Sequence, residues 1–374
     1  MPNTRYLVVG GGMTADAAVK GIREHDADGP ILLVGAEQHP PYKRPPLTKG
    51  LWSGADEASI WKHTSDAGAD LILGRRIESI DLDARRATDD TGEEHEFEQL
   101  LLATGGTPRR LGGDDSEVIY FRTLDDYRRL RELAADGARV TVIGGGFIGS
   151  ELAAGLTGAG AKVTMIFPEA TIGGRIFPSA LGQFVTDYYR EKGVDVHTGE
   201  TVSSVGDLGA DVVVAGLGIV PNTELAEQLG LPVDNGIIVD EYGRAADGVF
   251  AAGDVASFPS AALGKRFRVE HEDHANTHGR VVGANMAGAN KPYDHLPFFY
   301  SDLFDLGYEA VGDVDSRLAT VETWTEPNRK GTVAYVDDAG RPRGFLLWNV
   351  WDKVDAARDL IAAGERVGEG AIAQ

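Results

Sequence analysis

Residues 140–156 read VTVIGGGFIGSELAAGL, and this stretch decides the fold of the chain. It begins as a β-branched run, breaks at three consecutive glycines and resumes with apolar residues at helical spacing. It therefore predicts a strand, a turn and a helix in direct succession. Gly144, Gly146 and Gly149 have the G-x-G-x-x-G spacing of a dinucleotide-binding turn, in which the backbone approaches a pyrophosphate at a helix N-terminus. A single match is weak evidence, because glycines are common at strand–helix turns.

A second copy of the pattern lies almost at the N-terminus. Residues 6–19 read YLVVGGGMTADAAV, with Gly10, Gly12 and Ala15 at the three positions of the motif. The last of these positions accepts either glycine or alanine. Two copies in one chain indicate two nucleotide-binding units, and hence two dinucleotides.

Composition and charge exclude several classes of protein. The 374 residues are 42% hydrophobic and 25% charged, which suits a globular protein of two or three domains. A formal net charge of -22 argues against nucleic acid as a partner, because binding to phosphate chains depends on cationic side chains. No apolar run approaches the roughly 20 residues of a membrane helix. A strand expected from Tyr6 leaves no room for a signal peptide, so we expect a cytoplasmic protein without a membrane span.

The chain contains no cysteine. This absence removes disulfides, cysteine metal sites and every redox mechanism that stores electrons on a protein thiol. Electrons that enter a bound cofactor must therefore leave it directly for an acceptor.

An acidic residue follows the second strand expected in each unit. Glu37 comes after the apolar run 31–34, and Glu169 comes after the run 162–167. At this position a carboxylate can accept hydrogen bonds from the adenosine ribose. A solvated loop acid is the alternative for Glu37. Because a carboxylate repels a 2′-phosphate, Glu169 predicts a preference for NADH over NADPH.

A stiff basic segment lies between these two regions. Residues 39–52 read HPPYKRPPLTKGLW, and the four prolines hold the backbone extended. Lys43, Arg44 and Lys49 are presented on it in an otherwise acidic chain. Cations on a rigid loop beside a phosphate-binding turn suit a pyrophosphate or an anionic flavin, and ordinary surface charge is the alternative.

Here the residues resemble a known family. RPPLTK, residues 44–49, resembles the RPPLSK segment of the group of FAD-dependent enzymes that contains apoptosis-inducing factor and the oxygenase-coupled ferredoxin reductases. ATGGTPRRL, residues 103–111, resembles the ATG motif of this group. FAAGDVA, residues 250–256, resembles its GD motif, whose aspartate binds the flavin ribityl chain.

Four further segments resemble the apoptosis-inducing factor family in particular. They are VEHEDHA at 269–275, YSDL at 300–303, GYEAVG at 307–312 and GFLLWNVWDKVDAARDLI at 344–361. The resemblance covers nearly the whole chain. Mitochondrial members carry a long C-terminal insertion and a cationic surface that are missing here, so their DNA-binding role is not expected. They also pair through arginines in the segment where Ile238 and Ala246 stand, which leaves the oligomeric state open.

The order of elements and the resemblance predict the same architecture. We expect an α/β fold with two nested Rossmann-like dinucleotide-binding domains, as in glutathione reductase, and a small C-terminal α+β domain. The expected FAD-binding domain is discontinuous, over residues 1–110 and 234–295. The NADH-binding domain is expected over 111–233. Short β-like runs and the helical pattern 354–363 place the C-terminal domain at 296–374.

The two glycine turns and the resemblance together assign residues to the cofactors FAD and NADH. Expected on the FAD side are Gly10, Gly12, Met13, Thr14, Ala15, Glu37, Arg44, Pro45, Lys49, Ala103, Thr104, Gly105, Arg109, Gly253, Asp254, Glu270, His271 and Tyr300. Expected on the NADH side are Gly144, Gly146, Phe147, Ile148, Gly149, Glu151, Glu169, Gly216 and Gly218.

Lys49 and Glu151 are the candidate catalytic residues. The resemblance implies that they form an ion pair near the N5 edge of the flavin, with Glu151 facing the incoming nicotinamide. Hydride transfer needs the two reacting atoms held in near-attack geometry and needs no protein nucleophile. Phe147 and Tyr300 are candidate aromatic walls for the nicotinamide, although many family members have tryptophan in place of Tyr300. Core packing is the alternative for both.

No metal site is expected. The run HEDH, residues 271–274, contains ligand-type residues. Adjacent positions on a regular element point in different directions, however, so the run does not predict a shared metal ion.

The sequence thus predicts an FAD-dependent oxidoreductase that accepts hydride from NADH on flavin N5. The electron acceptor is left open among oxygen, a quinone and a small iron protein. The missing cysteines exclude the active site of disulfide reductases. One alternative is an NADH-dependent ferredoxin or rubredoxin reductase, against which the acidic surface argues weakly because ferredoxins are usually acidic. The other is an NADH-sensing redox scaffold with little turnover.

Overall fold

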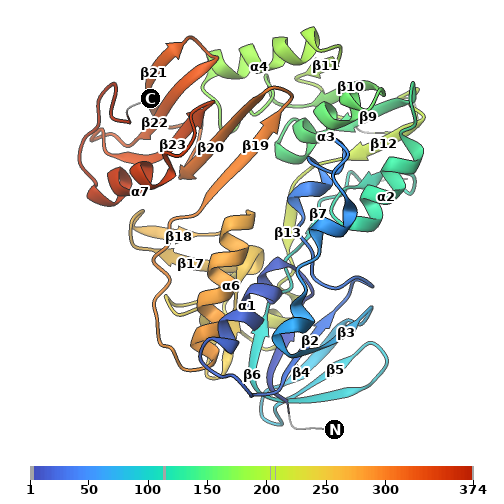
Figure 1. The fold of residues 1–374 in the computed structure, drawn as a ribbon, viewed down its shortest axis with the longest axis vertical. Helices are drawn as coiled ribbons and strands as arrows, with labels where there is room; N and C mark the ends of the chain where they lie inside the picture. Colours follow the sequence, from blue (N-terminus) through green and yellow to red (C-terminus); the bar gives the residue numbers. More distant parts are fainter. Residues whose placement is uncertain (1–3, 113–114, 203, 207, 373–374) are drawn as a thin grey trace. The chain divides into compact units, whose positions relative to one another are not determined.

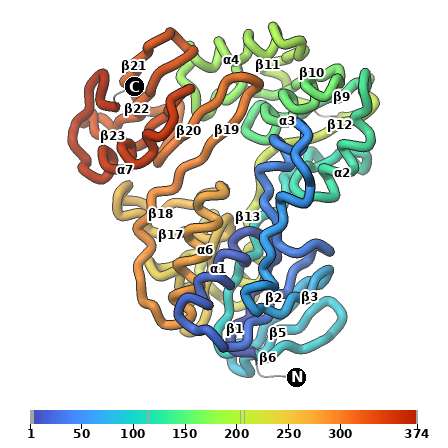
Figure 2. The backbone as a smooth tube through the Cα atoms, in the orientation of Figure 1, coloured from blue at the N-terminus to red at the C-terminus, as the bar shows by residue number. Residues whose placement is uncertain are grey.

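The computed structural model describes residues 4–112, 115–202, 204–206 and 208–372. The chain forms two compact units (Figure 1). The first unit consists of Met1–Lys43, Ala58–Thr107 and Val220–Pro297, and the second of Arg44–Glu57, Pro108–Ile219 and Phe298–Gln374. In the tube of Figure 2, segments from the blue and the yellow-orange parts of the chain lie together in the first unit, so distant stretches of sequence build one core.

A mixed sheet forms the centre of the first unit, with the strand order β15-β16-β6-β1-β2-β3. Strands β16, β6, β1, β2 and β3 pair in parallel, and the hairpin β4–β5 adds to β6 in antiparallel. The strands are β1 Thr4–Val9, β2 Ile31–Gly35, β3 Ala69–Leu73, β4 Ile77–Asp81, β5 Arg86–Asp89, β6 Glu94–Leu102, β15 Arg244–Ala246 and β16 Val249–Ala251.

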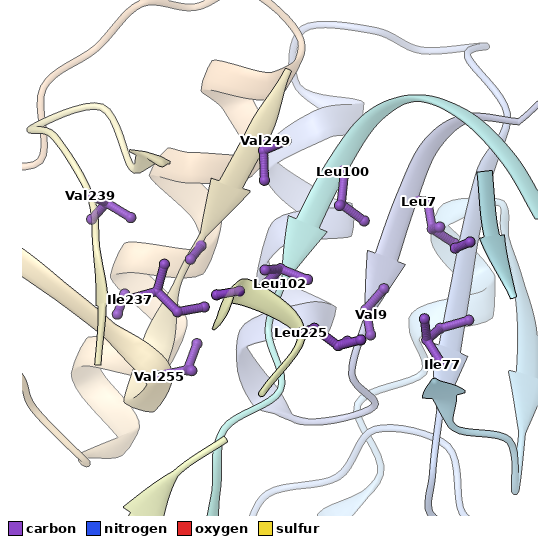
Figure 3. Close-up of a cluster of buried hydrophobic side chains, with 14 of the residues drawn as sticks. Leu7, Val9, Ile77, Leu100, Leu102, Leu225, Ile237, Val239, Val249 and Val255 are labelled. Carbon is purple, nitrogen blue, oxygen red and sulfur yellow. The ribbon is translucent and has the colours of Figure 1, made fainter. Parts of the chain in front are cut away.

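Alternate residues of the central strands face opposite sides of this sheet, as the two-residue period of a strand requires. Leu7, Val9, Leu100 and Leu102 point to one side, where they meet Val249 and side chains from the later part of the chain (Figure 3). Such burial on both faces is typical of parallel strands and explains their near-continuous apolar sequence.

Two helices cover the other side of the sheet. Helix α1 spans Met13–Arg23 and helix α6 spans Glu272–Met286. Val19 of α1 and Val282 of α6 belong to the buried cluster on this side. The helices approach so closely that a Cβ atom on Gly283 would lie 2.1 Å from the carbonyl oxygen of Ala18.

Small elements complete the first unit. Strands β14, β17 and β18 form a separate three-stranded sheet. Strand β16 thus extends the central sheet, whereas β14, a short way earlier in the chain, belongs to the small sheet. The elements are α5 Glu224–Gln228, β14 Ile237–Ile238, β17 Ala256–Ser260, β18 Lys265–Phe267 and the 3-10 helices Thr64–Ala67 and Gly253–Val255.

The second unit begins with a five-stranded parallel sheet in the order β11-β10-β9-β12-β8. The stretch 140–156 forms β9, the glycine turn and α3, as predicted. The elements are β8 Ile119–Tyr120, α2 Leu124–Leu133, β9 Arg139–Ile143, α3 Phe147–Gly158, β10 Lys162–Phe167, α4 Ser179–Glu191, β11 Asp195–Thr198 and β12 Val212–Ala215.

An antiparallel sheet with one helix ends the second unit. Its strand order is β19-β20-β23-β22-β21, and α7 packs on it. The elements are β19 Phe298–Leu303, β20 Leu306–Gly312, β21 Ala319–Glu326, β22 Lys330–Val336, β23 Pro342–Trp348 and α7 Val354–Ala363. The predicted α/β fold with a C-terminal α+β portion is confirmed. The predicted boundaries of the FAD-binding, NADH-binding and C-terminal domains stay a prediction.

Candidate functional site

The first glycine turn joins β1 to α1 and has the shape that a dinucleotide requires. Gly10 has a φ of +129°, and a Cβ atom there would lie 2.1 Å from the carbonyl oxygen of Ala103. Gly12 is the N-cap of α1, and a Cβ atom there would meet nothing within 4 Å. The turn is therefore closed toward the sheet and open beside the helix N-terminus, where a pyrophosphate binds in such units. Met13, Thr14 and Ala15 form the first turn of this helix.

The predicted residues Thr104 and Gly105 follow β6 and are held by Asn222. Thr104 Oγ1 donates to the carbonyl oxygen of Asn222 at 2.7 Å, and Asn222 Nδ2 donates back to that of Thr104 at 2.9 Å. The N–H of Asn222 also donates to the Gly105 carbonyl. Sequence analysis assigned no role in the site to Asn222, whose partners lie more than a hundred positions earlier.

Glu37 lies in the loop after β2, at the carboxyl end of the sheet. One of its oxygens accepts a hydrogen bond of 2.5 Å from the hydroxyl of Tyr42, which is buried. Tyr42 thus fixes the carboxylate at the place where an adenosine ribose is expected. The binding of ribose by Glu37 stays a prediction.

The turn at Gly253 and Asp254 meets the first turn of α1. A Cβ atom on Gly253 would lie 2.1 Å from Thr14 Oγ1, so the two segments predicted to hold FAD lie together. The N–H of Gly253 donates to His278 Nδ1 at 3.3 Å, and Arg268 donates to the carbonyl oxygen of Asp254 at 3.1 Å. Arg268 also forms a salt bridge of 2.6 Å with Glu270. Arg268 and His278 are positioning residues that the sequence motifs did not indicate.

Buried histidines lie on α6 behind this turn. The rings of His274 and His278 are 4.8 Å apart and pack against Phe258 and Tyr293. Neither Nε2 atom has a hydrogen-bond partner. Burial lowers the pKa of His274 to about 4 and that of His278 well below its usual range. Burial likewise lowers the pKa of His271, the N-cap of α6, to about 4.

The run 271–274 does not converge on one point. Asp273 pairs with His295 at 2.7 Å, while His274 faces the aromatic cluster. Among the described residues there is no group of three or more histidine, cysteine, aspartate and glutamate side chains that could hold a metal ion.

The second glycine turn repeats the geometry of the first. Gly144 has a φ of +118°, and a Cβ atom there would lie 2.4 Å from the carbonyl oxygen of Gly216. A Cβ atom on Gly149 would lie 2.0 Å from the Gly144 carbonyl oxygen, whereas Gly146, the N-cap of α3, has open space. Gly218, at a φ of +79°, accepts a hydrogen bond on its carbonyl from the N–H of Arg109.

Beside this turn, the predicted residues Phe147 and Ile148 form the start of α3. The ring of Phe147 makes an edge contact with Phe299, with ring centres 5.0 Å apart. Glu169, after β10, forms an ion pair with Arg175 at 2.9 Å.

Lys49 and Glu151 form the ion pair that the resemblance implied. Lys49 Nζ lies 2.7 Å from Glu151 Oε1, and the side chains are only 12% and 8% exposed. Two hydroxyl groups complete the carboxylate shell, because Ser301 Oγ donates to Oε1 at 2.6 Å and Thr48 Oγ1 donates to Oε2 at 2.5 Å. A buried carboxylate is costly unless it is paired and hydrogen-bonded, and here it is both.

Tyr300 joins the same cluster through Lys49. The ammonium group of Lys49 lies 4.5 Å from the centre of the Tyr300 ring and 3.6 Å from Asp302. Lys49 comes from the proline-rich segment, Glu151 from α3 and Tyr300 from β19. Three distant parts of the chain thus surround one cation. The hydrogen-bond donors Thr48 and Ser301 were not predicted, because nothing in the sequence distinguishes them from other hydroxyl residues.

The other predicted residues of the proline-rich segment have structural partners. Arg44 donates to the backbone carbonyl of Arg122 at 2.8 Å. The expectation that the prolines hold the whole segment extended is wrong, because Pro45–Leu47 form a 3-10 helix, whose φ values suit proline as well as an extended backbone does. Five residues expected on the FAD side fall in the second unit, while the rest fall in the first. The five are Arg44, Pro45, Lys49, Arg109 and Tyr300.

No helix in the described part of the chain combines the length and the apolar character that a membrane crossing requires.

Comparisons with known proteins agree with this geometry. Residues 4–279 match the family described as "Pyridine nucleotide-disulphide oxidoreductase", and residues 282–343 match "Apoptosis-inducing factor, mitochondrion-associated, C-term". Apoptosis-inducing factor 1 of Dictyostelium discoideum is 34% identical over 96% of this chain and 78% of its own length. The ferredoxin–NAD(+) reductase component of the anthranilate 1,2-dioxygenase system of Burkholderia cepacia is 35% identical, over 96% of this chain and 94% of its own.

Solved structures give the same result. Putidaredoxin reductase in its covalent complex with putidaredoxin superposes with a TM-score of 0.90 at 28% identity, over 98% of this chain and 94% of that one. The ferredoxin reductase for the CYP199A2 system from Rhodopseudomonas palustris gives a TM-score of 0.89 at 30% identity, over 98% and 96%.

Proposed function

The chain belongs to the pyridine nucleotide-disulphide oxidoreductase family and is an FAD-dependent NADH oxidoreductase, and from this premise we propose that it reduces a small iron–sulfur protein of the ferredoxin class. The observation that carries this proposal is the match with a ferredoxin–NAD(+) reductase component over 96% of this chain and 94% of that relative. The absence of cysteine supports it, because electrons cannot pass through a protein disulfide.

The residues of the first unit fit FAD. The open space beside Gly12 and the N-terminus of α1 suit its pyrophosphate, and Glu37 suits its ribose. Asp254, held through its backbone by Arg268, suits the ribityl chain. Bound FAD would supply hydride acceptance from NADH and the release of electrons, which no side chain of this protein can supply.

The residues of the second unit fit NADH in the same way. Gly146 leaves open space at the N-terminus of α3, and Glu169 stands after β10, where a ribose is expected. Lys49 and Glu151 act at the nicotinamide end in this proposal. Thr48 and Ser301 hold the carboxylate of Glu151, and that carboxylate fixes the ammonium group of Lys49. The cluster then acts by orienting groups, which is the contribution that hydride transfer requires from a protein.

The two open glycines give a test of the cofactor assignment. Gly146→Val is expected to leave FAD content unchanged and to raise the KM for NADH by about tenfold or more, because a side chain there fills space that is empty in the fold. Gly12→Val is the matched variant and is expected to lose FAD instead. Flavin absorbance after gel filtration and steady-state kinetics measure both effects. Loss of FAD in the Gly146 variant would show that FAD binds at the second glycine turn, where the proposal places NADH.

The main experiment measures electron flow with the whole protein. Purified protein is expected to show a flavin spectrum that bleaches on anaerobic titration with NADH. It should then reduce cytochrome c in the presence of a [2Fe–2S] ferredoxin at least about tenfold faster than without one. A rubredoxin and a quinone serve as alternative acceptors. A colourless protein that FAD does not reconstitute would overturn the cofactor assignment.

A second candidate function follows from the C-terminal match to apoptosis-inducing factor. Under this alternative the protein is an NADH sensor with little turnover. NADH would bleach the flavin once, the colour would return slowly in air, and none of the acceptors would accelerate its return. That result would contradict the ferredoxin proposal while leaving both cofactors in place.

A further inference from the structure

The turn between β19 and β20 holds a bulky residue in a strained conformation. The two strands pair up to Leu303 and Leu306, so Phe304 and Asp305 form a loop of two residues. In the turns that close such hairpins, the first loop residue has a positive φ, which favours glycine. Phe304 occupies this position with a φ of +61°. A phenylalanine is strained there, so contacts of its ring must offset the strain.

The ring of Phe304 packs against the C-terminal end of helix α4. The centre of this ring lies 5.0 Å from that of Tyr189 and 6.1 Å from that of Tyr188, both in edge contacts. The ammonium group of Lys192 lies 5.8 Å from the ring centre of Phe304. Asp305 adds a salt bridge of 2.7 Å to Lys192 and accepts from the hydroxyl of Tyr188. The tip of the hairpin is thus anchored to α4.

Tyr189 connects this anchor to helix α3. The side chain of Tyr189 is fully buried, and its hydroxyl donates to the carbonyl oxygen of Ser150 at 3.0 Å. Burial raises the pKa of Tyr189 well above its usual range, so the hydroxyl remains a donor near neutral pH. Ser150 directly precedes Glu151, whose carboxylate pairs with Lys49 and accepts from Ser301. The turn of α3 that carries the carboxylate is therefore also held from the hairpin tip.

The same hairpin reaches the ion pair a second time, through strand β19. Tyr300 and Ser301 stand four and three positions before Phe304. At about 3.3 Å per residue, the turn lies only about 10 Å along the strand from Ser301. Turn geometry fixes the register of a hairpin, and a slip of one residue would turn these side chains to the opposite face. A rigid turn therefore determines where Tyr300 and Ser301 meet Lys49 and Glu151.

We infer that Phe304 is a positioning residue for hydride transfer, because its strained turn and its contacts with α4 hold β19 and α3 in the arrangement that places Lys49 against Glu151. The inference rests on the role proposed above for this ion pair at the nicotinamide. Glycine would close the same turn without strain, but it would leave the hairpin tip without its ring contacts. The cost of the strained phenylalanine is thus explained by the anchor that its ring provides.

The test follows anaerobic reduction of the flavin by NADH in the holoenzyme, by stopped-flow absorbance and per bound flavin. Phe304→Gly should lower the limiting rate by about tenfold, since small displacements of orienting groups have effects of this order or larger. The Kd for NADH should change by less than about threefold, because the loss falls on the reaction step and not on binding. Phe304→Tyr keeps the ring and should stay within about twofold of the native rate. A residue that contributed only to stability would not change the rate per bound flavin.

A matched control relaxes a strained hairpin in the first unit. Arg85 has a φ of +51° just before β5, in the connection from β4. Arg85→Gly removes a bulky residue with positive φ without changing the anchor to α4. This variant should keep the limiting rate within about twofold of the native value, as expected for a distant site.

A second variant tests the connection to α3. Tyr189→Phe keeps the buried ring but removes the hydrogen bond to Ser150, and it should lower the limiting rate about threefold, in proportion to one neutral hydrogen bond. If both residues act through one anchor, the rate loss in Phe304→Gly/Tyr189→Phe should be smaller than the product of the two single losses. Tyr189→Phe also tests the anchor if Phe304→Gly does not fold.

Three results would overturn the inference: a native limiting rate in Phe304→Gly, or in Tyr189→Phe, or an equal loss in Arg85→Gly. A rate loss that Phe304→Tyr shares in full would also contradict it. Glu151→Ala, measured in the same series, separates these results from the proposed function. Reduction of Glu151→Ala at the native rate would contradict the proposed role of the ion pair, whereas slow Glu151→Ala with fast Phe304→Gly would overturn only the inference.

Discussion

Replacing Glu151 by alanine is expected to destabilise the second unit by about 3 kcal/mol, because Lys49, whose side chain is only 12% exposed, would lose its nearest anionic partner and keep only the more distant and exposed Asp302. Thr48 and Ser301 would also lose the acceptor of their hydroxyl groups. The same change should slow anaerobic flavin reduction by NADH by about 100-fold, since a small misplacement of reacting groups costs that much. Urea unfolding and stopped-flow absorbance measure the two effects.

Two further variants separate stability from catalysis. Lys49→Met/Glu151→Ala removes both charges and should recover more than half of the lost stability, yet hydride transfer should stay slow. Glu57→Ala breaks an exposed pair with Arg128 and should cost less than about 1 kcal/mol. Glu151→Ala is expected to keep its FAD. If loss of flavin were the main effect of this variant, Glu151 would belong to the FAD site and not to the NADH site.

Lowering the pH from 7 to 4 is expected to remove several kcal/mol of stability from the first unit. The folded pKa of His274 is depressed to about 4 from an ordinary value of 6.5. A group with a depressed folded pKa stabilises the fold above its unfolded pKa, and this contribution is lost as the pH falls toward the folded value. His274 alone accounts for about 3 kcal/mol at pH 4, and buried His278 acts in the same direction.

The pH range over which stability is lost distinguishes the protonation of these histidines from that of carboxylates. Burial raises the pKa of Asp89, but hydrogen bonds from Thr91 and from the Glu93 backbone outweigh it and hold the pKa well below its usual range. Asp89 therefore loses its contribution only below about pH 4. The free energy of unfolding in urea, measured between pH 7.5 and 4.5, should fall steeply below 6.5. His274→Phe should flatten that slope, and an unchanged slope would contradict the assignment.

The parts of the fold that local patterns control could be predicted from the sequence. The β-branched run, the three glycines and the helical spacing of residues 140–156 gave a strand, a turn and helix α3. The period of the pattern at 354–363 likewise gave α7 at those bounds. Each of these features depends on residues a few positions apart, for which periodicity is informative.

The contacts that complete the site could not be predicted, because they join residues far apart in the chain. Thr48 and Ser301 reach Glu151 across 103 and 150 positions. A serine or threonine has no property in the sequence that marks it as the donor to one particular carboxylate. Lys49 and Glu151 were identified only because whole motifs resembled a family. Arg175, the partner of Glu169, was missed because it stands in a loop without periodicity.

The loop 168–178 between β10 and α4, here called the Arg175 loop, is bonded to the antiparallel sheet portion of the second unit, and these bonds have a consequence for modularity. Ser316 Oγ donates to the carbonyl oxygen of Gly174 at 2.8 Å, and the hydroxyl of Tyr335 donates to that of Ile176 at 2.5 Å. A chain that ended before Phe298 would leave the carbonyls of Gly174 and Ile176 without their donors and Glu151 without Ser301. The antiparallel sheet is therefore not an independent module beside the coenzyme-binding sheet. The two sheets are expected to unfold together as one cooperative block. Recombining this sheet with a coenzyme domain from another relative would require the Arg175 loop to be exchanged with it.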